Sequence, residues 1–416
     1  MIFNTKKAPK EILVLMVGIG GYGFYYFLTL LDEFPKGKVK LAGIVDPYVK
    51  QSPIYDRIAK LDIPVFSEIK DFYENGLAAD LAVISSPIHF HVPQSIIALK
   101  NGTNVLCEKP ISATVQETDE LIRAKNESGK WVSIGYQWFY SKAIQSLKND
   151  IKKGLFGKPI RLKTLVLWPR DDSYYNRNNW AGRIKDDSGS WILDSPANNA
   201  AAHFLFNMLF LLGDETESSA IPKELLAECY HANPIKNYDT IACRIFAHDE
   251  VELLFYTSHA TKKKMGPVFE FKFEDGIVRF GGAFKEIVAT DNKGNKKYYG
   301  SPDDCPQFLK LFRAVDACSN PEPVLCGLEA ARAHTVCVNG IQESTVEINT
   351  FPKSIINRDE KNNRWWVTGL DKILMDCYEN NRLPSEGKIS WATEGRMVDL
   401  VDYNFFPVKK PKIRED

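Results

Sequence analysis

Short apolar runs alternate with longer amphipathic stretches over the first part of the chain. The apolar runs are ILVLMV, VKLAGIVD, LAVISS, TNVLCEK and WVSIGY, and intervening segments such as FYYFLTLLDEF have helical spacing. This repetition of strand and helix predicts a parallel sheet with helices on both faces, and the expected first domain spans residues 1–135.

The pattern changes after Tyr136, where alternating and short apolar runs predict strands and longer periodic segments predict helices. Strands are expected at 159–168, 240–247, 251–257, 267–273 and 277–280, and helices at 145–155, 200–213, 306–319, 327–346 and around 367–379. This mixture predicts a second, α+β domain over residues 136–416, built on a large and mostly antiparallel sheet.

Composition and charge narrow the class of partner. In 416 residues, 53 Lys and Arg balance 53 Asp and Glu, so no net field attracts nucleic acid or an anionic membrane. A small neutral ligand is favoured instead. The eight cysteines stand singly without zinc-ligand spacing, which is typical of reduced thiols in the cytosol and predicts no metal site. No run approaches the roughly 20 apolar residues that a membrane-spanning helix needs.

A glycine-rich motif directly follows the first apolar run. The sequence VGIGGYG places Gly18, Gly20, Gly21 and Gly23 between an expected strand and an expected helix. There, Gly18 permits a tight turn, Gly20 lets backbone N–H groups approach a pyrophosphate, and Gly23 allows the helix to pack closely on the strand. The helix N-terminus adds the positive end of its dipole. A purely structural turn is the less favoured interpretation.

An acidic residue at the end of the second apolar run complements the glycines. Asp46 ends LAGIVD, 23 residues after Gly23. A carboxylate in this position accepts hydrogen bonds from both ribose hydroxyls and repels a 2′-phosphate. The cofactor is therefore predicted to be NAD rather than NADP, although Asp46 could also do no more than cap its strand.

Further motifs show a resemblance to a known family. SSPIHFHVPQSIIALKNGTNVLCEKP (85–110) and GYQWF (135–139) follow the glycine motif in order. Together they resemble the Gfo/Idh/MocA oxidoreductases, closely over about the first 140 residues and more loosely beyond. The resemblance implies an N-terminal, doubly wound Rossmann domain and a C-terminal domain whose open sheet mediates homodimers or homotetramers. It also implies a sugar, polyol or glycoside as the small-molecule substrate.

The same resemblance implies roles for residues around the E-K-P triplet. Ser86, Pro87 and His91 are expected along the nicotinamide side of the cofactor, and Glu108 and Lys109 where cofactor meets substrate. Lys109 is expected to contact the reacting oxygen, because an ammonium stabilises the negative charge that develops there. Without the resemblance, Lys109 would be taken for a solvated surface charge.

The second half of the expected site lies in SGSWILDSPANNAAAHFLFNMLFLLG (188–213). His203 has the family's spacing between its catalytic histidine and the end of that helix. The family's usual aspartates are replaced by Asn199, four residues before His203, and by Phe206. Four residues apart on a helix, Asn199 and His203 would share one face, and Asp194 could supply a charge from the loop. A structural histidine on a buried helix face is the alternative.

A polar, aromatic loop, WPRDDSYYNRNNWAG (168–182), resembles the substrate-binding segment of the family. Arg170, Tyr174 and Tyr175 are its candidate substrate-binding residues, because sugars offer both C–H patches and hydroxyls. A bracing role within the fold is an equally open interpretation. His259, at the end of a strand in YTSHAT, is assigned no role.

These residues favour one reaction and leave two alternatives. In the favoured reaction, His203 takes the hydroxyl proton, the carbon transfers hydride to NAD⁺, and Lys109 stabilises the oxygen, so that the reverse reaction reduces a ketone. The first alternative is a glycosidase that retains NAD, oxidises C3 transiently, eliminates the glycosidic substituent and reduces the product again. The second is a non-catalytic NAD-binding sensor or scaffold, which the two missing aspartates suggest.

Overall fold

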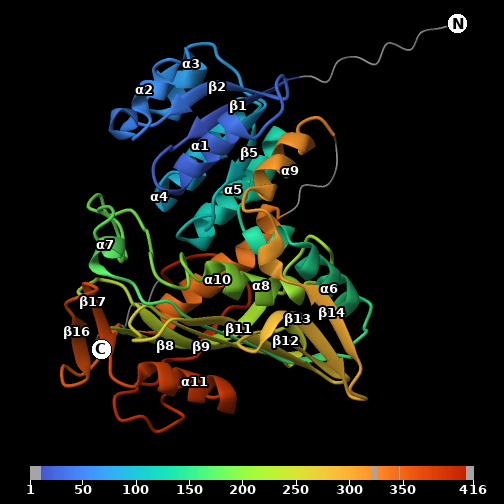
Figure 1. The fold of residues 1–416 in the computed structure, drawn as a ribbon, viewed down its shortest axis with the longest axis vertical. Coiled ribbons are helices and arrows are strands. Elements are labelled where there is room, and N and C mark those ends of the chain that lie inside the picture. The colour runs from blue at the N-terminus through green and yellow to red at the C-terminus, as the bar shows by residue number, and fades with distance from the viewer. Residues whose placement is uncertain (1–10, 321–325, 346, 409–416) are drawn as a thin grey trace, which may run out of the picture. The chain divides into compact units, whose positions relative to one another are not determined.

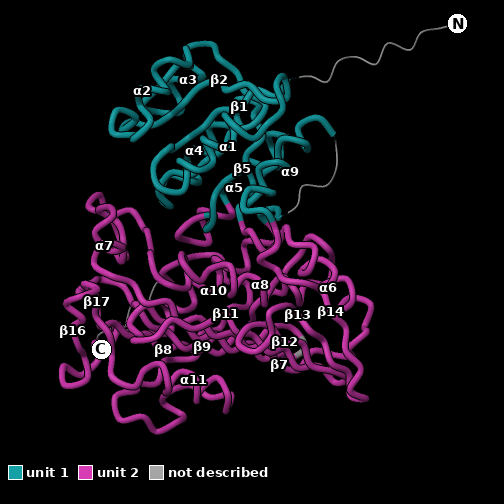
Figure 2. Tube along the Cα trace, viewed as in Figure 1, with its two compact units in different colours: residues 1–111, 120–135, 306–328 teal, residues 112–119, 136–305, 329–416 magenta. Residues whose placement is uncertain are grey.

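The chain forms two compact units in the computed structural model, which describes residues 11–320, 326–345 and 347–408 (Figure 1). Figure 2 shows unit 1, which comprises Met1–Ile111, Glu120–Gly135 and Pro306–Leu328, and unit 2, which comprises Ser112–Asp119, Tyr136–Cys305 and Glu329–Asp416. One junction between the units falls at the expected boundary after residue 135. The segment 306–328 belongs to unit 1 although it follows most of unit 2 in the sequence.

Six strands in the described part of unit 1 form a parallel sheet with the order β3-β2-β1-β4-β5-β6. The strands are β1 (Ile12–Val17), β2 (Val39–Val45), β3 (Val65–Phe66), β4 (Leu81–Ile84), β5 (Asn104–Cys107) and β6 (Val132–Ile134). The strand order reverses between β1 and β4, and ligands bind doubly wound sheets at the carboxyl ends of such neighbours. The predicted doubly wound Rossmann fold is confirmed.

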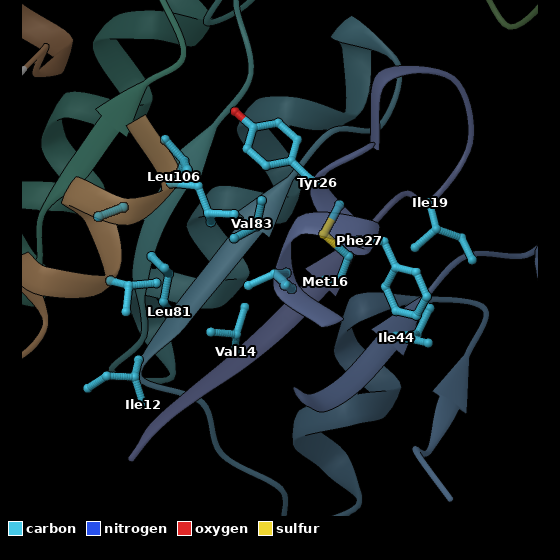
Figure 3. Packing of buried hydrophobic residues seen from close by; sticks show 14 of the residues in the cluster. Ile12, Val14, Met16, Ile19, Tyr26, Phe27, Ile44, Leu81, Val83 and Leu106 are labelled. Atoms are coloured by element: carbon cyan, nitrogen blue, oxygen red, sulfur yellow. The ribbon is translucent and has the colours of Figure 1, made fainter. Parts of the chain in front are cut away.

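The core of unit 1 lies between this sheet and its helices (Figure 3). The helices are α1 (Tyr22–Asp32), α2 (Tyr55–Ile58), α3 (Ile69–Glu74), α4 (Ile88–Lys100), α5 (Val115–Ser128), whose first residues are in unit 2, α9 (Leu309–Ala317) and the 3-10 turn Val49–Gln51. Leu311 and Val315 of α9 are buried in the same cluster as Val14 and Met16 of β1. This shared burial explains why 306–328 belongs to unit 1.

Ten strands in the described part of unit 2 form one sheet with the order β14-β13-β12-β11-β7-β10-β9-β8-β15, and β18 also pairs with β8. The strands are β7 (Pro159–Leu167), β8 (Pro222–His231), β9 (Thr240–Ala247), β10 (Glu252–Ser258), β11 (Met265–Phe273), β12 (Gly276–Gly281), β13 (Phe284–Asp291), β14 (Lys296–Gly300), β15 (Asn349–Thr350) and β18 (Val398–Asp399). Only β7 with β10 and β8 with β15 pair in parallel among the described residues. The predicted mostly antiparallel sheet is confirmed.

Helices lie on both sides of this sheet in Figure 1. On one side are α6 (Lys142–Lys152), α8 (Ala202–Leu211) and α10 (Leu328–Ser344), and on the other is α11 (Leu370–Asn380). Leu370, Leu374 and Cys377 of α11 are buried against Leu165 of β7 and Leu254 of β10. This part of the sheet face is therefore covered by the chain itself. The homodimer or homotetramer stays a prediction.

Shorter elements complete the described structure. They are α7 (Asp172–Tyr175), the hairpin of β16 (Ile356–Asp359) and β17 (Arg364–Val367), and the 3-10 turns Gln137–Tyr140, His248–Glu250 and Pro302–Asp304. No helix within the described residues has the length and apolar character needed to cross a membrane.

Replacing Leu374 by Ala tests the contribution of α11 to unit 2. Leu374 is 1% exposed, so the substitution leaves a cavity and should lower the free energy of unfolding by about 2–5 kcal/mol. Lys372, exposed on the same helix, is the control, and Lys372→Ala should change stability by less than about 0.5 kcal/mol. Guanidinium-induced unfolding measures both values, and an unchanged midpoint for Leu374→Ala would show that α11 does not stabilise the sheet.

Candidate functional site

The glycine motif forms the turn between β1 and α1. Gly18 and Gly21 have φ angles of 80° and 51°, and α1 begins directly after Gly21. A Cβ atom on Gly18 would lie 2.9 Å from backbone atoms of Ser85 and Ser86, and one on Gly23 would lie 2.1 Å from the Gly18 carbonyl oxygen. Packing within unit 1 therefore requires the first and last glycines of the motif.

Gly20 is different, because among the described residues no atom outside Gly20 and its two chain neighbours lies within 4 Å of the position where its Cβ would be. The protein's own packing therefore does not explain why this position lacks a side chain. A bare backbone beside the start of a helix allows close approach of a pyrophosphate, so the turn fits the dinucleotide that the sequence predicts.

Asp46 follows β2 and is held by the glycine turn. Its Oδ2 accepts a hydrogen bond from the backbone N of Ile19 at 2.8 Å, and its Oδ1 accepts one from the backbone N of Tyr48 at 2.7 Å. Each carboxylate oxygen can accept a further hydrogen bond, so ribose hydroxyls can still bind here. The two backbone contacts fix the carboxylate beside the turn, where the sequence predicts it.

His91 joins two turns at the carboxyl edge of the sheet. Pro87 is the N-cap of α4, and His91, on the first turn of that helix, is 2% exposed. Its Nε2 lies 2.8 Å from the Ser86 carbonyl oxygen and its Nδ1 lies 2.7 Å from the Pro110 carbonyl oxygen. Burial lowers the pKa of His91, and the two carbonyl contacts oppose that shift. His91 thus fixes Ser86 relative to the E-K-P turn, and its place beside the nicotinamide stays a prediction.

Glu108 of the E-K-P triplet is buried within unit 1. Its Oε1 accepts hydrogen bonds from Tyr26 Oη at 2.7 Å and from Lys310 Nζ, which also donates to the Gly135 carbonyl oxygen at 3.0 Å. Burial alone would raise the pKa of Glu108, but the charges of Lys310 and Lys109 outweigh it and hold the pKa below its usual value. Glu108 therefore links α1 and α9 through Tyr26 and Lys310, and its contact with a ligand stays a prediction.

Lys109, which is half-buried, directly follows Glu108. Its backbone N donates to Glu108 Oε2 at 3.2 Å, and its peptide bond to Pro110 is cis. The backbone of Lys109 is thus fixed to a carboxylate that α9 holds in place. Lys310 lies 202 residues from Glu108, and no local pattern in the sequence indicates their pairing.

Lys310→Met should strongly destabilise unit 1. The change leaves the Glu108 carboxylate buried without its cation, and breaking such a pair costs about 3–5 kcal/mol. The double variant Glu108→Gln, Lys310→Met removes both charges and should recover part of this loss. Chemical denaturation of the three proteins measures the effect. Equal stability of the single variant and the unaltered protein would show that the pair does not stabilise the fold.

Asn199 and His203 lie in unit 2 at the start of α8, but not on one helix. The helix begins at Ala202, so Asn199 belongs to the preceding turns, and the predicted helical placement of both residues on one face is wrong. Ser and Asn side chains explain the difference, because they bond to local backbone groups in place of the helix. Ser195 Oγ accepts from the Asn198 backbone, and the Asn198 amide donates to the Leu193 carbonyl oxygen.

His203 lies in the first turn of α8 and is half-buried. Its ring stands edge-on to that of Tyr136, with 5.8 Å between ring centroids and an interplanar angle of 88°. Tyr136 belongs to the motif GYQWF, so two segments singled out in the sequence meet within unit 2. The catalytic role of His203 stays a prediction.

Asp194 connects the turn before α8 to the loop 168–182. Its side chain accepts hydrogen bonds from the amide of Asn199 at 2.8 Å and from the backbone N of Gly182 at 2.6 Å, and Arg177 lies 3.6 Å away. Asp194 therefore places its charge next to Asn199, and its action on His203 stays a prediction.

The predicted substrate-binding residues of the loop lie together in unit 2. The ring of Tyr174 has the guanidinium of Arg170 at 4.7 Å and that of Arg177 at 3.9 Å. Tyr175 Oη lies 3.1 Å from Nδ1 of His259, and the Arg170 backbone N donates to the His259 carbonyl oxygen. His259 received no role from the sequence. Only the parallel pairing of β7 with β10, whose ends meet here, brings it to the loop.

Stability should depend on pH through His259. Burial, followed by the charges of Arg170 and Arg177, holds the pKa of His259 well below its usual value, so the folded protein keeps the ring neutral. The unfolded chain gains a proton below about pH 6.5, so this contribution to stability is present above that pH and is lost as pH falls, by about 1.4 kcal/mol per pH unit.

Thermal or chemical unfolding between about pH 7.5 and about pH 5.5 measures this dependence. A His259→Gln variant should lose less stability over this range than the unaltered protein, because His91 and the other titrating groups are common to both. Parallel pH profiles for the two proteins would contradict the assignment.

Comparisons with known proteins bear on unit 1 most directly. Residues 12–136 match the family model GFO_IDH_MocA, described as an oxidoreductase family with an NAD-binding Rossmann fold. The family resemblance and the choice of an NAD-type cofactor are thereby confirmed.

Two curated relatives are similar to part of the chain. The scyllo-inositol 2-dehydrogenase (NAD(+)) of Bacillus subtilis is 27% identical over 156 residues, which cover 37% of this chain and 44% of the relative. The 2,7-anhydro-N-acetylneuraminate hydratase of Mediterraneibacter gnavus is 26% identical over 35% of this chain and 38% of the relative. The matched region thus spans less than half the length of these relatives.

Solved structures share the fold over most of the chain. The WlbA dehydrogenase from Bordetella pertussis, in complex with NADH and UDP-GlcNAcA, has a TM-score of 0.66 at 19% identity, covering 80% of this chain and 95% of that one. An oxidoreductase from Agrobacterium radiobacter, in complex with NAD+, L-tartaric acid and magnesium, has a TM-score of 0.62 at 14% identity, covering 79% and 94%. At these identities the likeness establishes the fold alone.

Proposed function

We propose that this chain, whose residues 12–136 match the GFO_IDH_MocA oxidoreductase family model, is an NAD-dependent dehydrogenase acting on a hydroxyl of a sugar, polyol or glycoside. The observation that carries this proposal is the turn around Gly20, which is open where a pyrophosphate would bind and lies beside the fixed carboxylate of Asp46. The named activities of the inositol dehydrogenase and the WlbA dehydrogenase support the substrate class.

In this proposal, bound NAD⁺ supplies the acceptor for a hydride from the substrate carbon. His203 accepts the proton of the hydroxyl, and the ammonium of Lys109 stabilises the negative charge that develops on the oxygen. Asn199, whose amide nitrogen donates to Asp194, presents its amide oxygen to a neighbouring substrate hydroxyl. In the reverse direction the same groups reduce a ketone, with His203 returning the proton.

Lys109→Met tests the proposed reaction. Removing one charge-stabilising donor should lower kcat/KM by roughly 100- to 1,000-fold while NAD binding is retained. Lys100, exposed on α4 of the same unit, provides the matched control, and Lys100→Met should leave activity unchanged. Absorbance of NADH during incubation with inositols, free sugars and glycosides measures the rates. Full activity of Lys109→Met would exclude the proposed role.

A double variant tests whether the two groups act in one step. If Lys109 and His203 act on the same hydroxyl, the double variant Lys109→Met, His203→Ala should be little slower than the slower single variant, because the effects of groups that act as a unit are not additive.

Release of free sugar from a glycoside without net NADH would instead support the closed-cycle glycosidase. NAD binding with no turnover of any compound would support the sensor.

A further inference from the structure

We propose that the substrate of this protein carries an anionic group, a carboxylate or a phosphate, which binds to Arg170 with help from Lys264. This inference names the substrate class more narrowly and rests on the proposed function. It assigns Arg170 a ligand that the neutral composition of the chain does not suggest.

Arg170 lies where the ends of two parallel strands meet. Leu167 of β7 pairs with Ser258 of β10, and the chain continues past both strands with hydrogen bonds from Trp168 N to the Ser258 carbonyl oxygen and from Arg170 N to the His259 carbonyl oxygen. The residues that follow β7 therefore run beside those that follow β10, which include Lys262, Lys263 and Lys264. Cations from two segments therefore lie together at the carboxyl ends of β7 and β10.

Two of these cations share an aromatic surface. The guanidinium of Arg170 lies 5.8 Å from the ring centroid of Trp168, and Nζ of Lys264 lies 5.9 Å from the same centroid. Arg170 also stacks on Tyr174. Cation–π contacts hold the charges in place, but an aromatic ring does not accept the in-plane hydrogen bonds of a guanidinium.

Arg170 has no acceptor for its buried donor among the described residues. Its Nε is buried without a hydrogen-bond partner, and none of the described carboxylates forms an ion pair with its guanidinium. Arginine stays protonated in proteins, so it cannot relieve this cost by losing its charge. A buried donor without a partner costs about 1–3 kcal/mol, and more when it is charged.

The acidic side chains near Arg170 bind groups other than its guanidinium. Asp171 caps α7 by accepting from Tyr174 N at 3.0 Å and from Ser173 Oγ at 2.7 Å. Asp172 accepts two hydrogen bonds from Arg358, at 2.8 and 2.7 Å. The carboxylate of Asp194 is bound to Gly182, Asn199 and Arg177, as described above. The three carboxylates near Arg170, two of which lie in the loop 168–182, therefore have defined partners, whereas the Arg170 guanidinium has no carboxylate partner among the described residues.

His259 adds a second unsatisfied group to the same cluster. Its Nε2 is buried without a partner among the described residues, while its Nδ1 contacts Tyr175 Oη. When Tyr175 donates to Nδ1, the neutral ring carries its hydrogen on Nε2. An incoming group with several acceptor oxygens satisfies such donors, and a negative charge matches the guanidinium. A carboxylate or phosphate has both properties, whereas a sugar hydroxyl lacks the charge.

Binding of matched probes to the full chain with NAD tests this inference. The probes are D-glucose, D-glucuronate and D-glucose 6-phosphate, with acetate and inorganic phosphate as the anions alone, and tryptophan fluorescence reports binding near Trp168. We expect at least one anionic probe to bind about tenfold tighter than glucose, and this preference to weaken as salt is added. The two anionic sugars distinguish a carboxylate from a phosphate.

Variants identify the residue responsible. Arg170→Gln should abolish the preference for the anion, and Arg170→Lys, which keeps the charge without the planar fork, should retain part of it. Arg279→Gln is the matched control, because it removes one arginine of the same unit while Glu270 keeps its contact with Lys163. If no anionic probe binds, or if Arg170→Gln binds it as tightly as the unaltered protein, the inference is wrong.

The inference and the proposed function fail separately. NAD reduction by neutral polyols that is insensitive to Arg170→Gln would keep the dehydrogenase and overturn the anionic substrate. Anion binding that depends on Arg170, without NAD reduction by any compound, would keep the anion site and overturn the dehydrogenase.

Discussion

The carboxylate of Glu108 and the ammonium of Lys310 meet inside unit 1, where burial would make either charge costly alone. Their pairing allows a buried charged residue, Glu108, to follow β5 directly at the point where the chain turns toward Lys109. It also explains why a helix from late in the sequence belongs to the nucleotide-binding unit, since α9 supplies the cation as well as apolar core residues. The conformation of the E-K-P turn is therefore stabilised by α9, a helix distant in the sequence.

The nucleotide-binding half was largely predictable from the sequence. A parallel strand covered on both faces requires a continuous apolar run, and ILVLMV coincides with β1 (Ile12–Val17). The glycines were predictable because close approach of backbone atoms excludes any side chain at Gly18 and Gly23. Such constraints act within a few residues of the chain, so a local pattern records them.

Features that depend on distant partners were not predictable. The sequence of β14, KKYYG, has no apolar alternation, and the strand exists because β13 pairs with it. The amphipathic pattern of α9 predicts a helix but does not say which unit it packs against. The placement of Asn199 was predicted wrongly because the apolar, alanine-rich run favours a helix. The side chains of Ser195 and Asn198 bond to local backbone groups instead, and the helix begins only at Ala202. His259 reached the loop only through strand pairing.

Lys310 and Arg170 differ in whether the fold supplies a partner for their charge. In unit 1, the buried Lys310 has a carboxylate partner, so its charge is accounted for within the fold. In unit 2, Arg170 has a buried donor without an acceptor among the described residues, although three carboxylates in neighbouring segments have partners of their own. The fold provides Lys310 with a carboxylate partner that lies 202 residues away in the sequence. It provides none for Arg170 within the described part of the chain, although acids lie nearby, and this difference supports the proposal that Arg170 binds a ligand.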